Sequence, residues 1–104
     1  MKWLLNQVLP GTFRRGRPRE TEPEKLLELY SFEGCPSCRR VRRVLTELEL
    51  DFIHRSAPNG GRRNRALVKE RGGKEQFPYL LDPNTGQAMY ESRDIVAYLL
   101  RTYG

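Results

Sequence analysis

Apolar residues from position 25 onwards follow two different periods, one typical of buried strands and the other of amphipathic helices. The clearest helical pattern places Val41, Val44, Leu45 and Leu48 at i, i+3, i+4 and i+7, on one face of a helix. Short apolar segments with β-prone residues lie before and after it and predict strands. The predicted elements are strand 26–32, helix 36–50, strand 51–55, helix 62–73, strands 77–81 and 87–91, and a terminal helix from Ser92.

Turn and capping residues support these boundaries. The segment 82-DPNTG-86 is rich in turn residues and predicts a β-hairpin. The Gly72-Gly73 pair suits a helix C-terminus, and Ser92 is a good N-cap. The order β-α-β-α-β-β-α predicts an α/β fold with a four-stranded mixed sheet, in which a right-handed crossover makes the first two strands parallel and the hairpin adds an antiparallel pair. This arrangement is thioredoxin-like.

The chain length and its uneven composition indicate one domain behind a leader. A chain of 104 residues is long enough for one compact core. The segment 10-PGTFRRGRPRETEPE-24 has three prolines, two glycines and alternating charge, so it buries too little apolar surface to order itself. We therefore predict a flexible basic N-terminal leader over residues 1–24 and a folded domain over residues 25–104.

The net charge of +6 favours anionic partners, both polyanions and acidic small molecules. The arginines gather in clusters, but the sequence has no helix-turn-helix pattern, zinc-finger spacing or aromatic array, so no specific nucleic-acid partner is predicted. No apolar run approaches the roughly 20 residues of a membrane span, and the first eleven residues carry too short an apolar core for a signal peptide. These patterns predict a cytoplasmic protein without a membrane span.

Cys35 and Cys38 are the only cysteines, and they follow a predicted buried strand directly. Two cysteines are too few for a disulfide-stapled fold. A structural zinc site needs four ligands, whereas this chain adds only His54 on another strand, so no metal is expected. A CxxC pair that opens a helix after a strand, with Pro36 between the cysteines, is instead typical of a redox pair.

The predicted helix start assigns different roles to the two cysteines. Pro36 suits the first helical position, which makes Cys35 the N-cap residue. The free amides and the helix dipole then favour the thiolate form of Cys35. Cys38 lies one turn later, at the flank of the apolar stripe, so we expect Cys35 to attack a disulfide and Cys38 or another thiol to release the mixed disulfide.

Four arginines follow the cysteine pair on the polar side of the same predicted helix. Arg39 is i+4 from Cys35 and Arg42 is i+4 from Cys38, so both are candidates to assist a thiolate or to meet an anionic substrate. Arg40 and Arg43 are interpreted as ordinary surface residues.

Three segments of the chain resemble glutaredoxins and, more closely, the N-terminal glutathione-binding domain of glutathione S-transferases in a stand-alone form. These segments are 29-LYSFEGCPSCRRVRRVL-45, 72-GGKEQFPYLLDPNTG-86 and 89-MYESRDIVAYL-99. They span most of residues 26–104. The resemblance implies a glutaredoxin-type fold and a glutathione-dependent thiol-disulfide oxidoreductase, acting on disulfides or glutathione mixed disulfides of proteins and small molecules.

The resemblance also implies a glutathione site. Pro78 falls where the family has a cis-proline facing the active cysteine, and Phe77 lends its backbone to the cysteine of glutathione. Glu91 and Ser92 match the pair that holds the γ-glutamyl end. The implied catalytic residues are Cys35 and Cys38, and the implied glutathione-binding residues are Phe32, Gly34, Pro36, Arg39, Phe77, Pro78, Glu91 and Ser92.

The sequence departs from the family pattern at Phe32, where glutaredoxins usually carry a lysine for the glycine-end carboxylate of glutathione. Arg39, Lys74 and Gln76 are candidate substitutes. The all-helical second domain of a full transferase is not predicted, so glutathione conjugation is not expected.

Two alternative functions remain open on the sequence. One is a non-catalytic glutathione-binding or protein-interaction domain. The other is a [2Fe-2S] carrier, in which Cys35 and glutathione from each of two subunits hold the cluster. The chain is predicted to be a monomer or a weak dimer.

Overall fold

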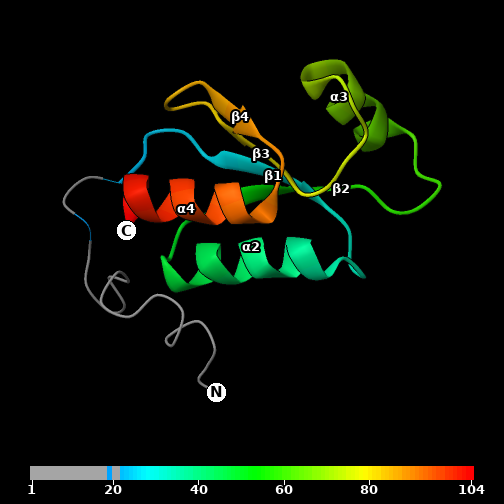
Figure 1. Cartoon of the computed structure of the whole chain (residues 1–104). Helices are drawn as coiled ribbons and strands as arrows, with labels where there is room; N and C mark the ends of the chain where they lie inside the picture. The colour runs from blue at the N-terminus through cyan, green and yellow to red at the C-terminus, as the bar shows by residue number, and fades with distance from the viewer. Residues whose placement is uncertain (1–18, 20–21) are drawn as a thin grey trace.

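Seven secondary-structure elements follow one another in the predicted order. The computed structural model describes residue 19 and residues 22–104, so the rest of the predicted leader lies outside the described residues. The elements are β1 (Leu27–Ser31), α2 (Pro36–Glu47), β2 (Phe52–Ser56), α3 (Arg63–Gly72), β3 (Tyr79–Asp82), β4 (Gln87–Met89) and α4 (Ser92–Tyr103) (Figure 1).

The strands form one mixed sheet in the order β2-β1-β3-β4. β1 pairs with β2 in parallel, and Leu27 lies opposite Phe52. β3 is antiparallel to both β1 and β4. This topology confirms the predicted fold class.

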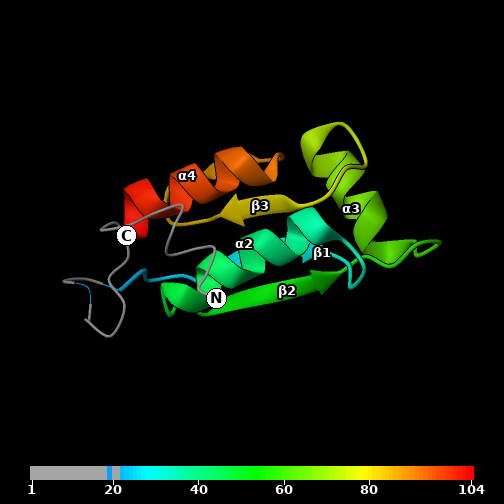
Figure 2. The same cartoon turned by 60° about the horizontal axis from the view of Figure 1, so that its bottom comes forward.

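One face of the sheet is covered by α2 and α4, which lie side by side (Figures 1 and 2). The stripe predicted on α2 packs there, since Val41, Val44 and Leu45 are fully buried. Leu27 and Leu29 of β1 belong to the same core cluster. The amphipathic pattern of α2 thus defines the main core, and both helices begin at the end of the sheet near α3 (Figure 1).

The opposite face of the sheet carries α3 and a smaller cluster. Tyr30, Val68 and Tyr79 form this cluster, and Val68 is the only buried apolar residue of α3. α3 ends at Gly73, whose φ of 93° places it in the left-handed region. The Gly72-Gly73 prediction is therefore confirmed, because glycine reaches this conformation without the cost of a Cβ.

The predicted helix start at Ser92 is confirmed, but its predicted cap is wrong, and β3 starts later than predicted. Ser92 is the first helical residue of α4, and the residue that precedes the helix is Glu91, with a φ of 44° and its carbonyl accepting the Ile95 amide at 2.9 Å. The backbone turn at Glu91 therefore starts the helix, in place of a serine cap. The predicted strand at 77 begins at Tyr79, since Pro78 has no amide hydrogen to give to the sheet.

A buried carboxylate ties the β3–β4 turn to α4. The hydroxyls of Tyr98 and Tyr103 donate to Oδ2 of Asp82 at 2.5 and 2.6 Å. Asn84 donates to Oδ1 through its backbone and side-chain nitrogens, both at 2.9 Å. Burial alone would raise the pKa of Asp82, but the hydrogen bonds from Tyr103, Tyr98 and Asn84 outweigh it and lower the pKa.

Arg19 anchors the segment before β1 to the far ends of the two long helices. Its guanidinium donates to the backbone oxygen of Leu48, after α2, and to that of Tyr103 at the end of α4. A cation at helix C-termini is favoured by the helix dipoles. The described part of the leader is therefore attached at the end of the domain remote from Cys35.

Candidate active site

Strand β1 and helix α2 position Cys35 between them. The Cys35 amide donates to the Phe32 carbonyl at 3.2 Å and closes a turn after β1. Cys35 is the N-cap of α2, Pro36 occupies the first helical turn, and the Cys35 sulfur accepts the Cys38 amide at 3.2 Å. The predicted N-cap position of Cys35 is confirmed.

The two cysteines lie in different environments. Both are free thiols; Cys35 retains 7% of its surface and Cys38 retains none. Burial and the hydrogen bond with Cys35 raise the pKa of Cys38 to about 12, against the opposing effects of the Phe32 backbone and the Arg42 charge. Cys38 therefore remains a protonated thiol at neutral pH.

A cis peptide bond joins Phe77 to Pro78, as the resemblance implies. The rings of Phe77 and Phe32 meet edge to face with centroids 5.9 Å apart. Because Phe32 belongs to the turn that ends at Cys35, this contact brings the cis-proline segment against the cysteine turn.

Arg65 of α3 joins the same group of residues, although the sequence analysis did not place it in the site. Its guanidinium carbon lies 5.3 Å from the centroid of the Phe32 ring and 4.6 Å from that of Phe77. Nε donates to the carbonyls of Ala57 and Pro58 at 3.1 and 2.7 Å.

The outer nitrogens of the Arg65 guanidinium are also bonded. Nη1 lies 3.0 Å from Glu75 Oε2, and Nη2 donates to Asn59 at 3.3 Å. Arg65 therefore links the loop after β2, the segment before the cis-proline and the cysteine turn. No spacing in the sequence indicated this role, because its partners lie in separate segments.

The start of α4 brings Glu91 and Ser92 to the same end of the domain as Cys35 (Figure 1). Gln76 donates to a carboxylate oxygen of Glu91 at 2.9 Å. Lys74 lies with its Nζ 4.9 Å from the Tyr90 ring centroid. Two candidate substitutes for the missing lysine are thus already engaged with neighbouring side chains.

The four α2 arginines differ in exposure. Arg39, Arg40 and Arg43 are exposed, so Arg39 resembles the two residues interpreted as surface. Gly34 is exposed as well. Arg42 is half-buried and donates to the Ser31 hydroxyl at 3.1 Å.

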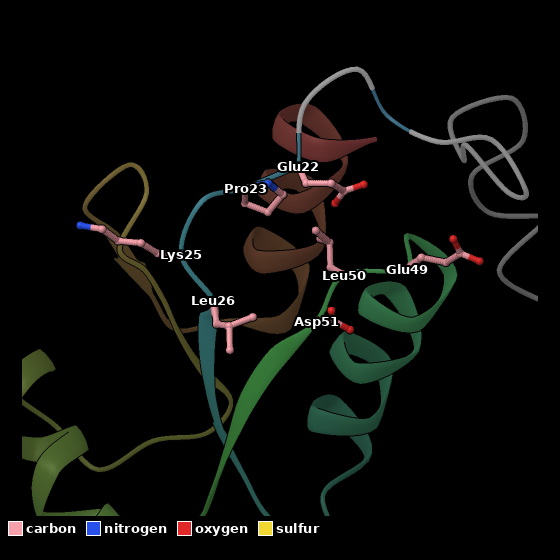
Figure 3. Close-up of a pocket in the computed structure, with 7 residues that line it drawn as sticks. All are labelled: Glu22, Pro23, Lys25, Leu26, Glu49, Leu50 and Asp51. Carbon is pink, nitrogen blue, oxygen red and sulfur yellow. The ribbon is translucent and has the colours of Figure 1, made fainter.

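Residues 19 and 22–104 offer few other kinds of site. These residues contain no group of three or more His, Cys, Asp or Glu side chains placed to hold a metal ion. A pocket of about 310 Å³ lies between residues 22–26 and the loop after α2, at the end of the domain away from Cys35 (Figure 3). Within the described part of the chain, no helix combines the length and apolarity needed to cross a bilayer.

The fold and the site define a thioredoxin-like domain with an N-capping cysteine and a facing cis-proline segment. The family model for the glutathione S-transferase N-terminal domain matches residues 29–104. The chain belongs to this family. None of the curated proteins matches the sequence.

Solved structures of glutathione transferases share this fold. The glutathione transferase BmGSTD1 of Bombyx mori is 27% identical with a TM-score of 0.69, over 81% of this chain and 38% of that one. A glutathione S-transferase from Methylobacterium radiotolerans, in complex with glutathione sulfonate, is 28% identical with a TM-score of 0.64, over 76% of this chain and 36% of that one. The chain therefore spans less than two fifths of the length of these proteins.

Proposed function

We propose that the protein is a glutathione-dependent thiol-disulfide oxidoreductase, with Cys35 as the nucleophile and Cys38 as the resolving thiol. The observation that carries this proposal is the asymmetry of the pair. The Cys35 sulfur accepts an amide hydrogen at the start of α2, whereas Cys38 is fully buried and its pKa is raised to about 12. The Cys35 sulfur thus lies at the partly exposed start of the helix, where it can meet a substrate, whereas Cys38 stays protonated until it is needed to release the mixed disulfide.

In the proposed reaction the Cys35 thiolate attacks the glutathione sulfur of a mixed disulfide. The substrate leaves as a thiolate and takes up a proton, and glutathione becomes bonded to Cys35. A second glutathione thiolate then attacks the glutathione sulfur on Cys35, which releases oxidised glutathione and restores the Cys35 thiolate. Overall, the mixed disulfide and one reduced glutathione become the substrate thiol and oxidised glutathione, so the substrate sulfur is reduced at the expense of the attacking glutathione.

The glutathione site is proposed from the residues that the resemblance implies and from the chemistry of their positions. The backbone of Phe77, before cis-Pro78, offers hydrogen-bonding groups to the cysteine of glutathione. The first turn of α4, from Ser92, offers free amides to the γ-glutamyl carboxylate, and Glu91 offers a carboxylate to the ammonium group. The complex of the Methylobacterium radiotolerans protein with glutathione sulfonate supports this type of ligand.

The test is a glutathione-coupled reduction of a small glutathione mixed disulfide, run on wild type, Cys35→Ser and Cys38→Ser. We expect full loss of activity in Cys35→Ser, because no other thiolate is available to attack. Cys38→Ser should retain activity, because glutathione can release the mixed disulfide. Arg40→Gln is a matched surface control and should keep the wild-type rate. An inactive wild-type protein that is folded by circular dichroism would contradict the proposal.

A further inference from the structure

A chain of hydrogen bonds runs from α2 to β2 through the buried end of β1. Arg42 Nη1 donates to the Ser31 hydroxyl at 3.1 Å, and that hydroxyl lies 2.5 Å from Nε2 of His54. Ser31 is fully buried, whereas His54 is on the exposed edge strand. The chain therefore connects the surface of the domain to the helix that carries both cysteines.

The donors and acceptors of this chain fix its direction. Arg42 donates only, so the Ser31 oxygen accepts from it. The Ser31 hydroxyl hydrogen then reaches Nε2 of His54, which accepts it if the imidazole is neutral with its proton on Nδ1. Desolvation and the charge of Arg42 lower the pKa of His54, against the opposing effects of the Ser31 backbone and Glu33. The neutral form therefore matches the observed contacts.

Protonation of His54 would reverse this last bond. An imidazolium Nε2 can only donate, so the Ser31 oxygen would have to accept from both Arg42 and His54, and its own hydrogen would lose its partner. The charged groups that face His54 in the described structure are Arg42 from α2 and Glu33 from the turn after β1. A second positive charge beside Arg42 would add repulsion to the broken bond.

Arg42 is the charged side chain that reaches Cys38. It lies one helical turn after Cys38 on α2, and it is the only charged residue outside the cysteine pair that acts on the Cys38 thiol within the described structure. Residues 19 and 22–104 show no ion pair that involves Arg42. Its position is therefore set by Ser31 and not by a neighbouring carboxylate.

We propose that Ser31 and neutral His54 are positioning residues for the resolving step, and that they hold the Arg42 guanidinium where it stabilises the thiolate of Cys38. This inference rests on the proposed function of the cysteine pair. It adds Ser31 and His54, which neither the family resemblance nor the spacing of the motif assigns to the reaction, and gives Arg42, a candidate from its spacing, a partner for its thiolate role.

The step concerned is the attack of Cys38 on the Cys35–glutathione mixed disulfide. Cys38 loses its proton to solvent, and its thiolate attacks the Cys35 sulfur. The Cys35–Cys38 bond forms, the bond from Cys35 to glutathione breaks, and glutathione leaves as a thiolate that takes up a proton. No external oxidant or reductant is needed, and Arg42 acts only on the small thiolate fraction of Cys38.

The experiment follows both disulfides after reduced protein is mixed with a glutathionylated peptide. Acid quenching and intact-mass spectrometry distinguish Cys35 bonded to glutathione from the internal disulfide. Arg42→Gln and Ser31→Ala should slow the conversion of the first species to the second by about three- to tenfold, because Cys38 loses the positive charge that lowers its pKa, an effect only partly offset by higher nucleophilicity. Ser31→Thr keeps the hydroxyl and should restore the rate, and Arg40→Gln is the surface control.

The pH profile separates positioning from a merely structural role. In wild type, the logarithm of the resolving rate should rise with pH with unit slope wherever His54 is neutral. At lower pH, where His54 becomes protonated, the rate should drop more steeply than unit slope. His54→Gln retains an acceptor for Ser31 without titrating, so its profile should keep unit slope throughout. Wild-type rates and profiles in Ser31→Ala and His54→Gln would overturn the inference.

A second measurement keeps this inference distinct from the proposed function. In a Cys35→Ser background, the rate of Cys38 modification by methyl methanethiosulfonate depends on the Cys38 thiolate and involves no glutathione. Adding Arg42→Gln or Ser31→Ala should slow this modification by the same factor. If wild type forms no mixed disulfide with glutathione, the proposed function fails. Unchanged Cys38 modification in these variants would independently overturn the role of Arg42.

Discussion

Replacement of Arg65 by alanine should destabilise the domain and disturb the surroundings of Cys35 together. The substitution removes the donor of two backbone carbonyls, and each loss costs about 1 kcal/mol. It also removes the Glu75 ion pair, worth about 0.5 kcal/mol at a partly exposed site, and the contact with two aromatic rings, worth about 0.5–1 kcal/mol. The side chain of Arg65 is 15% exposed, so most of these contacts are shielded from water.

The summed loss is about 3 kcal/mol, which corresponds to a fall of more than about 10 °C in the melting temperature of a domain of this size. Urea unfolding followed by circular dichroism measures the free energy, and the KM for glutathione reports on the Phe32–Phe77 contact. Arg65→Lys should recover only part of the stability, because an ammonium cannot serve all four acceptors of the guanidinium.

Arg63→Ala provides the matched control, since Arg63 is an exposed residue of the same helix, and it should change stability by less than about 0.5 kcal/mol. Equal stability of Arg65→Ala and Arg63→Ala would refute the assignment of Arg65 as the link between the three segments.

Three further predictions concern the buried carboxylate and the thiols. The pKa of Asp82 is lowered in the folded state. The ionised carboxylate therefore stabilises the fold above pH 3.8, its ordinary pKa, and this stabilisation is lost as the pH falls through the lowered pKa. Asp82→Asn should therefore flatten this part of an acid-unfolding curve. Tyr103→Phe removes one donor to Asp82 and should cost about 1–2 kcal/mol in urea unfolding, whereas the exposed change Arg93→Ala should have little effect. Iodoacetamide at neutral pH should label Cys35 and spare Cys38 in peptide mass spectra, because Cys38 is fully buried with a pKa raised to about 12; labelling of both at equal rates would contradict the assigned roles.

The sequence was informative wherever a local pattern determines the structure. The stripe of Val41, Val44 and Leu45 predicted the buried face of α2, and Pro36 predicted the N-cap position of Cys35. Turn residues likewise located the hairpin after Asp82. In each case the signal and the structure lie within a few residues of one another, so periodicity and capping preferences suffice.

The parts that the sequence did not predict depend on contacts between distant segments. Arg65 meets its partners only after α3 folds over the end of the sheet, and the Ser31–His54 contact depends on the parallel pairing of β1 and β2. The N-cap of α4 was misassigned because Glu91 adopts a positive φ, which its residue type does not favour. The cis bond at Pro78 was expected only through the family resemblance.

The contact of Arg19 with the ends of α2 and α4 has a practical consequence for attaching the protein to other molecules. Helix α2 has twelve residues and separates Arg19 from Cys35 by about 18 Å. A label or solid support joined through the N-terminus is therefore connected to the domain at the end remote from Cys35. Coupling through the N-terminus should present Cys35 to large, folded disulfide substrates, whereas coupling through side chains of α3 would obstruct them.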